Sequence, residues 1–119
     1  MTTEFDTKTA SRAARLVIRA SEHASEQVTM MRESLAQVWA KGFKVDGNRI
    51  ADYGNIEARY NTLARAAALL KQGAPEDELD EIALNGAMST ASTWSGFGEG
   101  YDRAERRAWG EVHELLHSI

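Results

Sequence analysis

Two histidines near the end of the chain, His113 and His117, have the spacing and the chemistry of metal ligands. Residues four apart on a helix lie one turn from each other on the same side, so both imidazoles can bind one metal ion weakly. The alternative role is electrostatic, because histidines in the last turn of a helix stabilise the negative end of its dipole. We favour the electrostatic interpretation.

The string from His113 to His117, HELLH, resembles the HExxH signature of zinc metallopeptidases. The resemblance implies that His113 and His117 hold zinc while Glu114 activates a water molecule. Such enzymes take a third ligand from further downstream, whereas this sequence ends at Ile119. A third ligand would have to be an upstream carboxylate that folding brings close. We therefore expect exposed histidines, no stoichiometric zinc and no other cofactor.

A second catalytic alternative uses the same segment, in which five residues separate Arg107 from His113. This spacing resembles the R-x(4–6)-H motif of HEPN ribonucleases, which are also helical bundles. The resemblance implies that the arginine and the histidine act on the phosphate and the 2′-hydroxyl of RNA. Ala108 departs from the motif, because that family usually has a polar residue at this position.

The string Trp94-Ser95-Gly96 resembles the turn of WxG-type helical hairpins that are exported by type VII secretion. Tyr101 and Glu105 follow it in the arrangement Y-x-x-x-[DE]. The resemblance implies a secreted helical hairpin, although the turn in this chain comes late rather than centrally. The other interpretation is a glycine-rich loop between two helices, held in place by aromatic residues.

A row of positive charge offers a site for a nucleic acid. Its residues recur three or four apart, which places them on one side of a helix, where they could hold phosphates. The row comprises Lys8, Arg12, Arg15 and Arg19. Glu22 and Glu26 continue the same side, and this favours a solvent-exposed surface whose charges pair with each other.

A compact acidic cluster offers a site for a basic protein. The cluster comprises Glu76, Asp77, Glu78, Asp80 and Glu81. It could dock in a basic groove of a partner, as mimics of nucleic acids do. The alternative is that these carboxylates stabilise the positive end of a helix dipole and keep the protein soluble.

These residues must be positioned by helices, of which the longest is predicted from Thr7 to Lys41. Small and apolar residues recur there at steps of three and four, which keeps them on one side of the helix. The stripe comprises Ala10, Ala13, Val17, Ala20, Ala24, Val28, Met31, Leu35 and Val38, and we expect the last four to be buried. Asp6 is the expected N-cap and Gly42 the expected stop.

Three shorter helices are predicted after a structured loop, for which a small hairpin at Asp46-Gly47 is the alternative. The first is capped by Asn55, runs from 56 to 72 and is closed by Gly73. The next starts at Pro75 and continues to 94, with Gly86 as a weak point that could break it. The last runs from 101 to 117. The sequence thus predicts one all-α domain, 1–119, built as a four-helix bundle.

Composition limits the function further. The net charge of −4 gives no bulk attraction to nucleic acids or anionic membranes, and no apolar run is long enough to span a membrane. The absence of cysteine excludes disulfides and thiolate metal sites and fits the reducing cytoplasm. We expect a cytoplasmic, non-catalytic module that binds another protein, with a hydrolase or a nucleic-acid-binding protein as alternatives.

Two further expectations concern assembly and class. The long first helix exceeds the others in length, so its uncovered part is expected to form a homodimer. Small acidic helical proteins of this kind are common among the inhibitors and adaptors of phages and mobile elements, which is an analogy at the level of the class.

Overall fold

The computed structural model describes residues 11–42, 47–88 and 99–117, with side chains except those of residues 47–51 and 99–102. These residues form four helices, α1 (Arg12–Ala40), α2 (Gly47–Lys71), α3 (Glu76–Met88) and α4 (Glu99–Leu116). No strand occurs among them. The prediction of a small all-α bundle with a long first helix is therefore confirmed.

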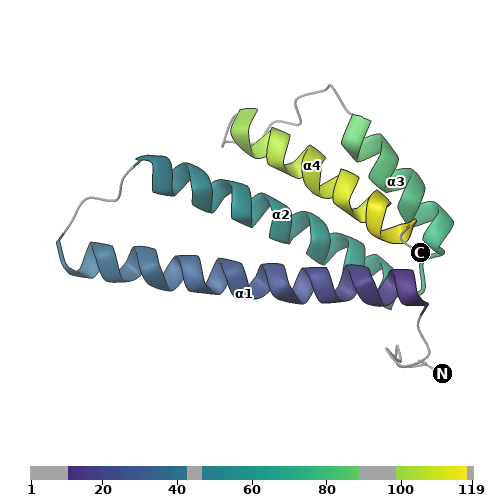
Figure 1. Ribbon diagram of the computed structural model, residues 1–119, viewed down its shortest axis with the longest axis horizontal. Coiled ribbons are helices and arrows are strands. Elements are labelled where there is room, and N and C mark those ends of the chain that lie inside the picture. Colours follow the sequence, from purple (N-terminus) through teal and green to yellow (C-terminus); the bar gives the residue numbers. More distant parts are fainter. Residues whose placement is uncertain (1–10, 43–46, 89–98, 118–119) are drawn as a thin grey trace.

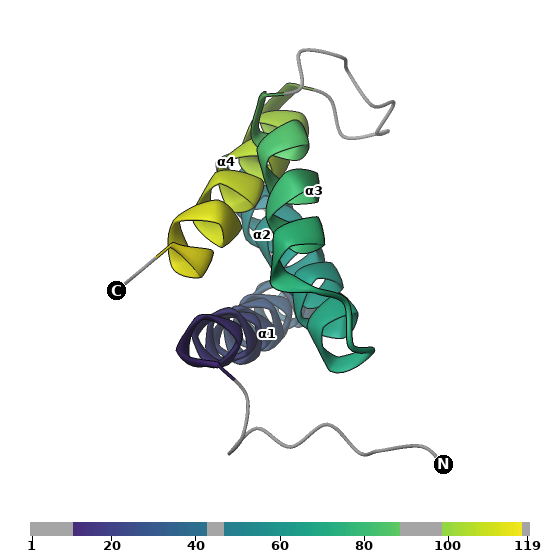
Figure 2. The same cartoon turned by 90° about the vertical axis from the view of Figure 1, so that its right-hand side faces the viewer.

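The helices are arranged as two hairpins of unequal length (Figure 1). Helices α1 and α2 run antiparallel and form the long hairpin, and α4 lies along α2. Helix α3 packs mainly against α4 and lies beside it in the view along the long axis (Figure 2). The C-terminal end of α1 and the start of α2 extend beyond α3 and α4 (Figure 1).

Helix α1 begins and ends at residues with specific roles. Ser11 caps it, because its hydroxyl oxygen accepts a hydrogen bond from the amide of Ala14 at 3.1 Å. The predicted cap, Asp6, lies outside the described residues. At the other end Gly42 has a φ of 79°, and its amide donates to the carbonyl of Trp39 at 3.0 Å. Glycine adopts this left-handed conformation without a steric penalty, so the predicted stop is confirmed.

Helix α2 begins at Gly47, so the prediction of a loop up to Asn55 is wrong. Gly54 and Asn55 are good cap and turn residues, but here they lie inside the helix. Packing against the C-terminal half of α1 explains the difference, since tertiary contacts override weak helix propensity. One such contact is the hydrogen bond that Nε of Arg32 donates to the hydroxyl of Tyr53 at 2.7 Å.

The end of α2 agrees with the prediction. Gly73 has a φ of 91° and its amide donates to the carbonyl of Leu70 at 3.1 Å. The amide of Ala74 donates to the carbonyl of Leu69 at 3.0 Å. These two bonds form a Schellman motif, in which a left-handed glycine satisfies the last carbonyls of the helix.

The other two helices differ from the prediction in detail. Helix α3 follows Pro75 as expected and is continuous through Gly86, which does not break it. It is described as far as Met88, so the predicted continuation to Trp94 lies outside the described residues. Helix α4 agrees with its predicted range within two residues at each end.

The core lies where all four helices meet, around the N-terminal half of α1. Its residues are small or aliphatic, with one aromatic side chain. They are Ala14, Val17, Ala24, Leu63, Ala66, Leu70, Leu79, Ala83, Trp109 and Val112. The many alanines allow the helix backbones to approach each other closely.

The predicted burial of the C-terminal half of α1 is only partly correct. Val28 is buried, but Met31, Leu35 and Val38 are half-buried. The apolar side was identified correctly, yet this half of α1 packs on α2 alone, while the other half also lies near α4 (Figure 1). The longer α2 also covers part of the surface that was expected to need a second copy of the chain.

Candidate functional site

One carboxylate lies between the two histidines of the HELLH string. Oδ1 of Asp80 on α3 accepts a hydrogen bond from Nδ1 of His113 at 2.6 Å, and Oδ2 accepts one from Nε2 of His117 at 2.9 Å. The imidazole rings are tilted by 56° with their centroids 4.5 Å apart. The upstream carboxylate that a third metal ligand would require is therefore present, and α3 supplies it.

The core determines this arrangement. Leu79 and Val112 are fully buried, and each directly precedes a polar member of the cluster, Asp80 or His113. Packing these two apolar side chains between α3 and α4 places the next residue of each helix at the edge of the interface. His117 follows one turn after His113 on the same side of α4.

The cluster is partly open to solvent. The exposed fractions of the side chains are 21% for Asp80, 34% for His113 and 60% for His117. Burial by itself raises the pKa of Asp80, but the hydrogen bonds from His117 and His113 outweigh it and lower the pKa below its ordinary value. Asp80 is thus a carboxylate at neutral pH, acceptor-only and able to bind a cation.

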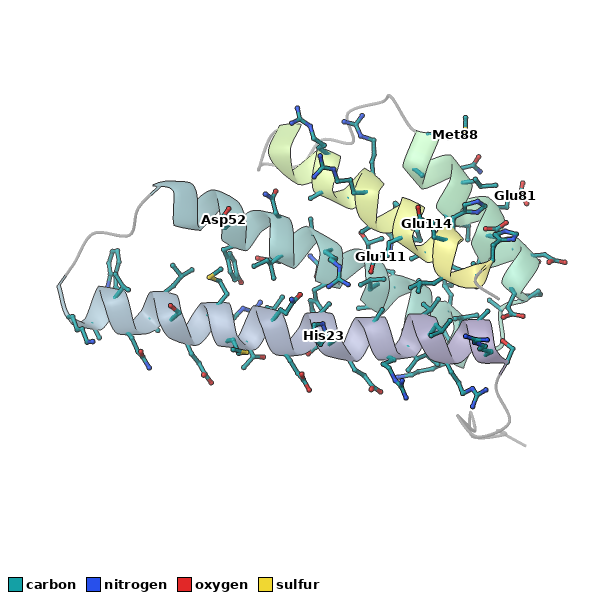
Figure 3. The ribbon with its side chains drawn as sticks, viewed as in Figure 1. His23, Asp52, Glu81, Met88, Glu111 and Glu114 are labelled. Atoms are coloured by element: carbon teal, nitrogen blue, oxygen red, sulfur yellow. The ribbon has the colours of Figure 1, made fainter. Side chains whose placement is uncertain are left out.

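Glu114, the remaining polar residue of the HELLH string, does not belong to the cluster. Its side chain is exposed on α4 (Figure 3), whereas the three groups that converge are Asp80, His113 and His117. The structure therefore brings Asp80 to the two histidines that the metallopeptidase resemblance makes metal ligands, but leaves the glutamate of the resemblance outside.

The structure does not bring Arg107 and His113 to a common place. Arg107 lines a shallow hollow together with Arg103, Ala104 and Asn55 of α2. His113 instead contacts Asp80 on α3, and the six-residue step between the two positions turns them well apart around α4. The arginine and the histidine that the ribonuclease resemblance requires to act together thus face different helices, α2 and α3.

The acidic cluster is divided by the fold. Glu76 accepts a hydrogen bond from the hydroxyl of Ser11 at 2.5 Å, so it brings negative charge to the N-terminus of α1, whose first turn has no acidic residue of its own. Asp80 is held by the two histidines. The other three members, Asp77, Glu78 and Glu81, are exposed on the outer side of α3.

Apolar side chains continue this outer side toward the end of α3. Ile82, Leu84 and Met88 are exposed by 42%, 38% and 76%. Asp77, Glu81, Leu84 and Met88 follow each other at steps of four, three and four, which places them along one side of the helix. Figure 3 shows Glu81 and Met88 projecting from α3 on the side away from the long hairpin. Sequence reasoning identified the acids but missed the apolar continuation, because the side of α3 that stays exposed depends on how this helix packs against α4.

The arginines of the positive row are exposed, and exposed glutamates follow them on the same helix. Arg12, Arg15 and Arg19 all lie on the solvent side of α1, and Glu22 and Glu26 are exposed on the following turns. Lys8 lies outside the described residues, as do Trp94, Ser95 and Gly96 of the WxG resemblance.

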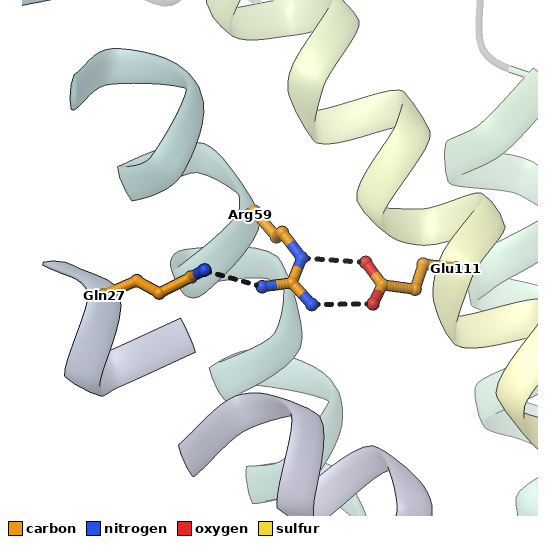
Figure 4. Close-up of polar contacts among 3 residues, drawn as sticks. All are labelled: Gln27, Arg59 and Glu111. Carbon is orange, nitrogen blue, oxygen red and sulfur yellow. Dashed lines mark hydrogen bonds and ion pairs between the residues drawn. The ribbon is translucent and has the colours of Figure 1, made fainter. Parts of the chain in front are cut away.

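An unpredicted ion pair, together with a hydrogen bond from the same arginine, links three helices (Figure 4). Nε and Nη2 of Arg59 on α2 donate to the two carboxylate oxygens of Glu111 on α4, at 2.9 and 2.8 Å, and Nη1 donates to Oε1 of Gln27 on α1 at 3.1 Å. The hydrogen bonds to Glu111 raise the pKa of Arg59, against the opposing effect of burial. This bidentate pair links α4 to α2.

Comparison with known proteins gives no family for this chain: no protein-family model, no curated protein and no solved structure matches it. Among the helices of the described ranges, none is long and apolar enough to cross a bilayer.

Proposed function

We propose that the protein is a non-catalytic helical module that binds another protein through the outer side of α3. The observation that carries this proposal is the pattern on that side, where exposed carboxylates are followed by exposed apolar side chains. Of the five large apolar residues exposed in the described part of the chain, three lie on this short helix. Exposed apolar residues that gather beside charges are typical of surfaces that bind a partner.

The chemistry of the surface specifies the partner. Asp77, Glu78 and Glu81 require a basic protein surface, and Leu84 and Met88 require an apolar pocket beside it. In such an interface the buried apolar side chains supply most of the affinity, whereas the charges at the rim accelerate association and select the partner. An inhibitor or adaptor that occupies a basic groove of its target has this character.

The experiment is quantitative capture of proteins from the cells that produce this chain, with variants compared in parallel. One variant, Glu78→Lys with Glu81→Lys, reverses the charge, and a second, Leu84→Ser with Met88→Ser, removes the apolar part. The matched control is Glu22→Lys with Glu26→Lys, a reversal of two exposed glutamates on α1. Circular dichroism confirms that each variant is folded.

We expect the wild-type protein and the α1 control to capture the same basic protein, and both α3 variants to lose it. Capture should weaken with added salt, since the charges at the rim are screened. Equal capture by all variants would contradict the proposal. Capture of RNA or DNA that depends on Arg12, Arg15 and Arg19 would instead assign the function to the nucleic-acid alternative.

A further inference from the structure

We propose that Asp80, His113 and His117 form a binding site for a divalent transition-metal ion, zinc above all, which joins α3 to α4. Their donor atoms, a carboxylate oxygen and two imidazole nitrogens, all lie within 4.8 Å of one another. They come from two different helices, so the site exists only in the folded chain. The inference is independent of the proposed docking surface.

The donor set determines which ions fit. Imidazole nitrogens suit zinc, copper and nickel, and a carboxylate is a common third ligand of zinc. Magnesium and calcium prefer oxygen ligands throughout, so two imidazoles select against them. Three protein ligands leave one position of a tetrahedral zinc ion for water, and the partial exposure of His113 and His117 gives the ion access from solvent.

Binding of one ion by all three residues requires their side chains to rearrange. With bonds of about 2.0–2.1 Å, two ligands of a tetrahedral zinc ion lie roughly 3.3 Å apart. The carboxylate of Asp80 is now 2.6 and 2.9 Å from the two imidazole nitrogens, as suits hydrogen bonds. These two distances join different carboxylate oxygens, and the three donor atoms lie within 4.8 Å of one another, so a shared ion requires the side chains to rotate until each pair of donors is roughly 3.3 Å apart.

The position of the site indicates what the ion does. Helix α3 is the shortest of the four described helices and packs mainly on α4. An ion shared by Asp80 and the two histidines adds a link between these helices, and Glu114 does not join the ligands. We therefore assign to the ion a structural role, in which it stabilises the packing of α3 on α4.

The first test is titration of the metal-free protein with zinc chloride, followed by calorimetry and thermal unfolding. We expect one zinc ion per chain, in contrast to the expectation of no stoichiometric zinc from the sequence, because Asp80 supplies a third ligand. Because the site exists only in the folded state, free zinc at a hundredfold excess over Kd should raise Tm by roughly 10 °C, and a chelator should reverse the rise. Magnesium chloride at the same concentration should leave Tm unchanged.

Variants separate this site from simple chelation by two histidines on one helix. Asp80→Ala and His117→Ala each remove one of the three ligands, and each should weaken zinc binding by at least about tenfold. Two controls should bind zinc as the wild-type protein does. One is His23→Ala, which removes the remaining histidine, exposed on α1, and the other is Glu114→Ala (Figure 3).

Unchanged zinc affinity in Asp80→Ala would overturn the proposal, because α4 alone would then hold the ion. If that variant fails to fold, Asp80→Asn decides the question, because it keeps the shape of the side chain and removes its charged zinc ligand. ¹⁵N spectra of the histidine rings in the wild-type protein then test whether the site is specific. Addition of one equivalent of zinc should shift the resonances of His113 and His117 and leave those of His23 in place. Equal shifts in all three rings, or none, would show that no specific site exists.

Discussion

At the scale of single residues, Gly86 has a role that its helix propensity does not reveal. A Cβ atom at this position would lie 2.5 Å from Cγ and 2.9 Å from Nε1 of Trp109, and it would also collide with Cδ1. The indole ring of Trp109 is buried and occupies the space that a side chain would need. Arg65 adds a cation–π contact, with its guanidinium carbon 5.7 Å from the ring centroid. Gly86 thus permits close approach of α3 and α4.

We predict that Gly86→Ala destabilises the protein by about 1–3 kcal/mol, because displacing Trp109 outweighs the gain in helix propensity of about 1 kcal/mol. The matched control is Gly54→Ala, where a Cβ meets no atom within 4 Å and the propensity gain should remain. Urea unfolding of both variants measures the difference. Similar stabilisation by the two substitutions would contradict the proposed contact.

The sequence predicts part of the residue-scale picture. His113 and His117 are recognisable as a possible donor pair because the rule of one helical turn is local, although the sequence favours an electrostatic role for them. Asp80 was read as one of five equivalent acids, because nothing in its own segment shows which carboxylate faces α4. That choice follows from the packing of Leu79 and Val112, which is a tertiary property. Gly86 was misjudged for the same reason.

At the scale of elements, Arg59 and Glu111 provide a measurable link between α2 and α4. Both side chains are partly exposed, so solvent reduces their interaction. In a double-mutant cycle with Arg59→Met and Glu111→Gln, we predict a coupling energy of about 1 kcal/mol at low salt. The coupling should fall as ionic strength rises. A coupling near zero at low salt would mean that this bidentate contact does not contribute to stability.

The ends of the helices show which local signals are reliable. Gly42 and Gly73 were predicted as stops, and both have positive φ angles because chain reversal after a helix requires them. Gly54 and Asn55 resemble a start signal equally well, yet α2 continues through them. The difference is that α1, the helix on which α2 packs, is long enough to stabilise additional turns of α2. The sequence of α2 itself does not contain that information.

At the scale of the whole molecule, the two ends of the long hairpin differ in packing. The principal extents are 51 × 32 × 29 Å, and the core lies at the end where α3 and α4 are added. The prediction of four helices was correct, but the order in which they pack was not derivable. Periodicity identifies the apolar side of each helix but not the helix that covers it.

This difference predicts unequal effects of two similar substitutions. Leu63→Ala, at a fully buried position in the core, should reduce the free energy of unfolding by ~3 kcal/mol. Leu35→Ala, at a half-buried position near the far end of α1, should cost less than half as much, because little of its apolar surface is removed from water. Urea unfolding at one temperature compares them, and equal losses would show that the far end is as tightly packed as the core.

Self-association is the last property of the whole molecule to consider. Trp39 is 74% exposed near the end of α1, beyond the part of the hairpin that α3 and α4 accompany. Burial of such a side chain in a second copy would remove a large apolar area from water. We therefore place the predicted homodimer contact at this end rather than along the whole uncovered length of α1, part of which α2 occupies.

We predict that light scattering gives twice the chain mass of 13.1 kDa and that Tm rises with protein concentration. Trp39→Ser should shift the equilibrium toward the monomer, because it removes the aromatic anchor of the contact. Met88→Ser, a similarly exposed apolar residue on α3, is the matched control and should leave the dimer intact. If the wild-type protein has the mass of one chain even at high concentration, the dimer prediction fails. If Met88→Ser dissociates the dimer instead, the two copies meet through α3.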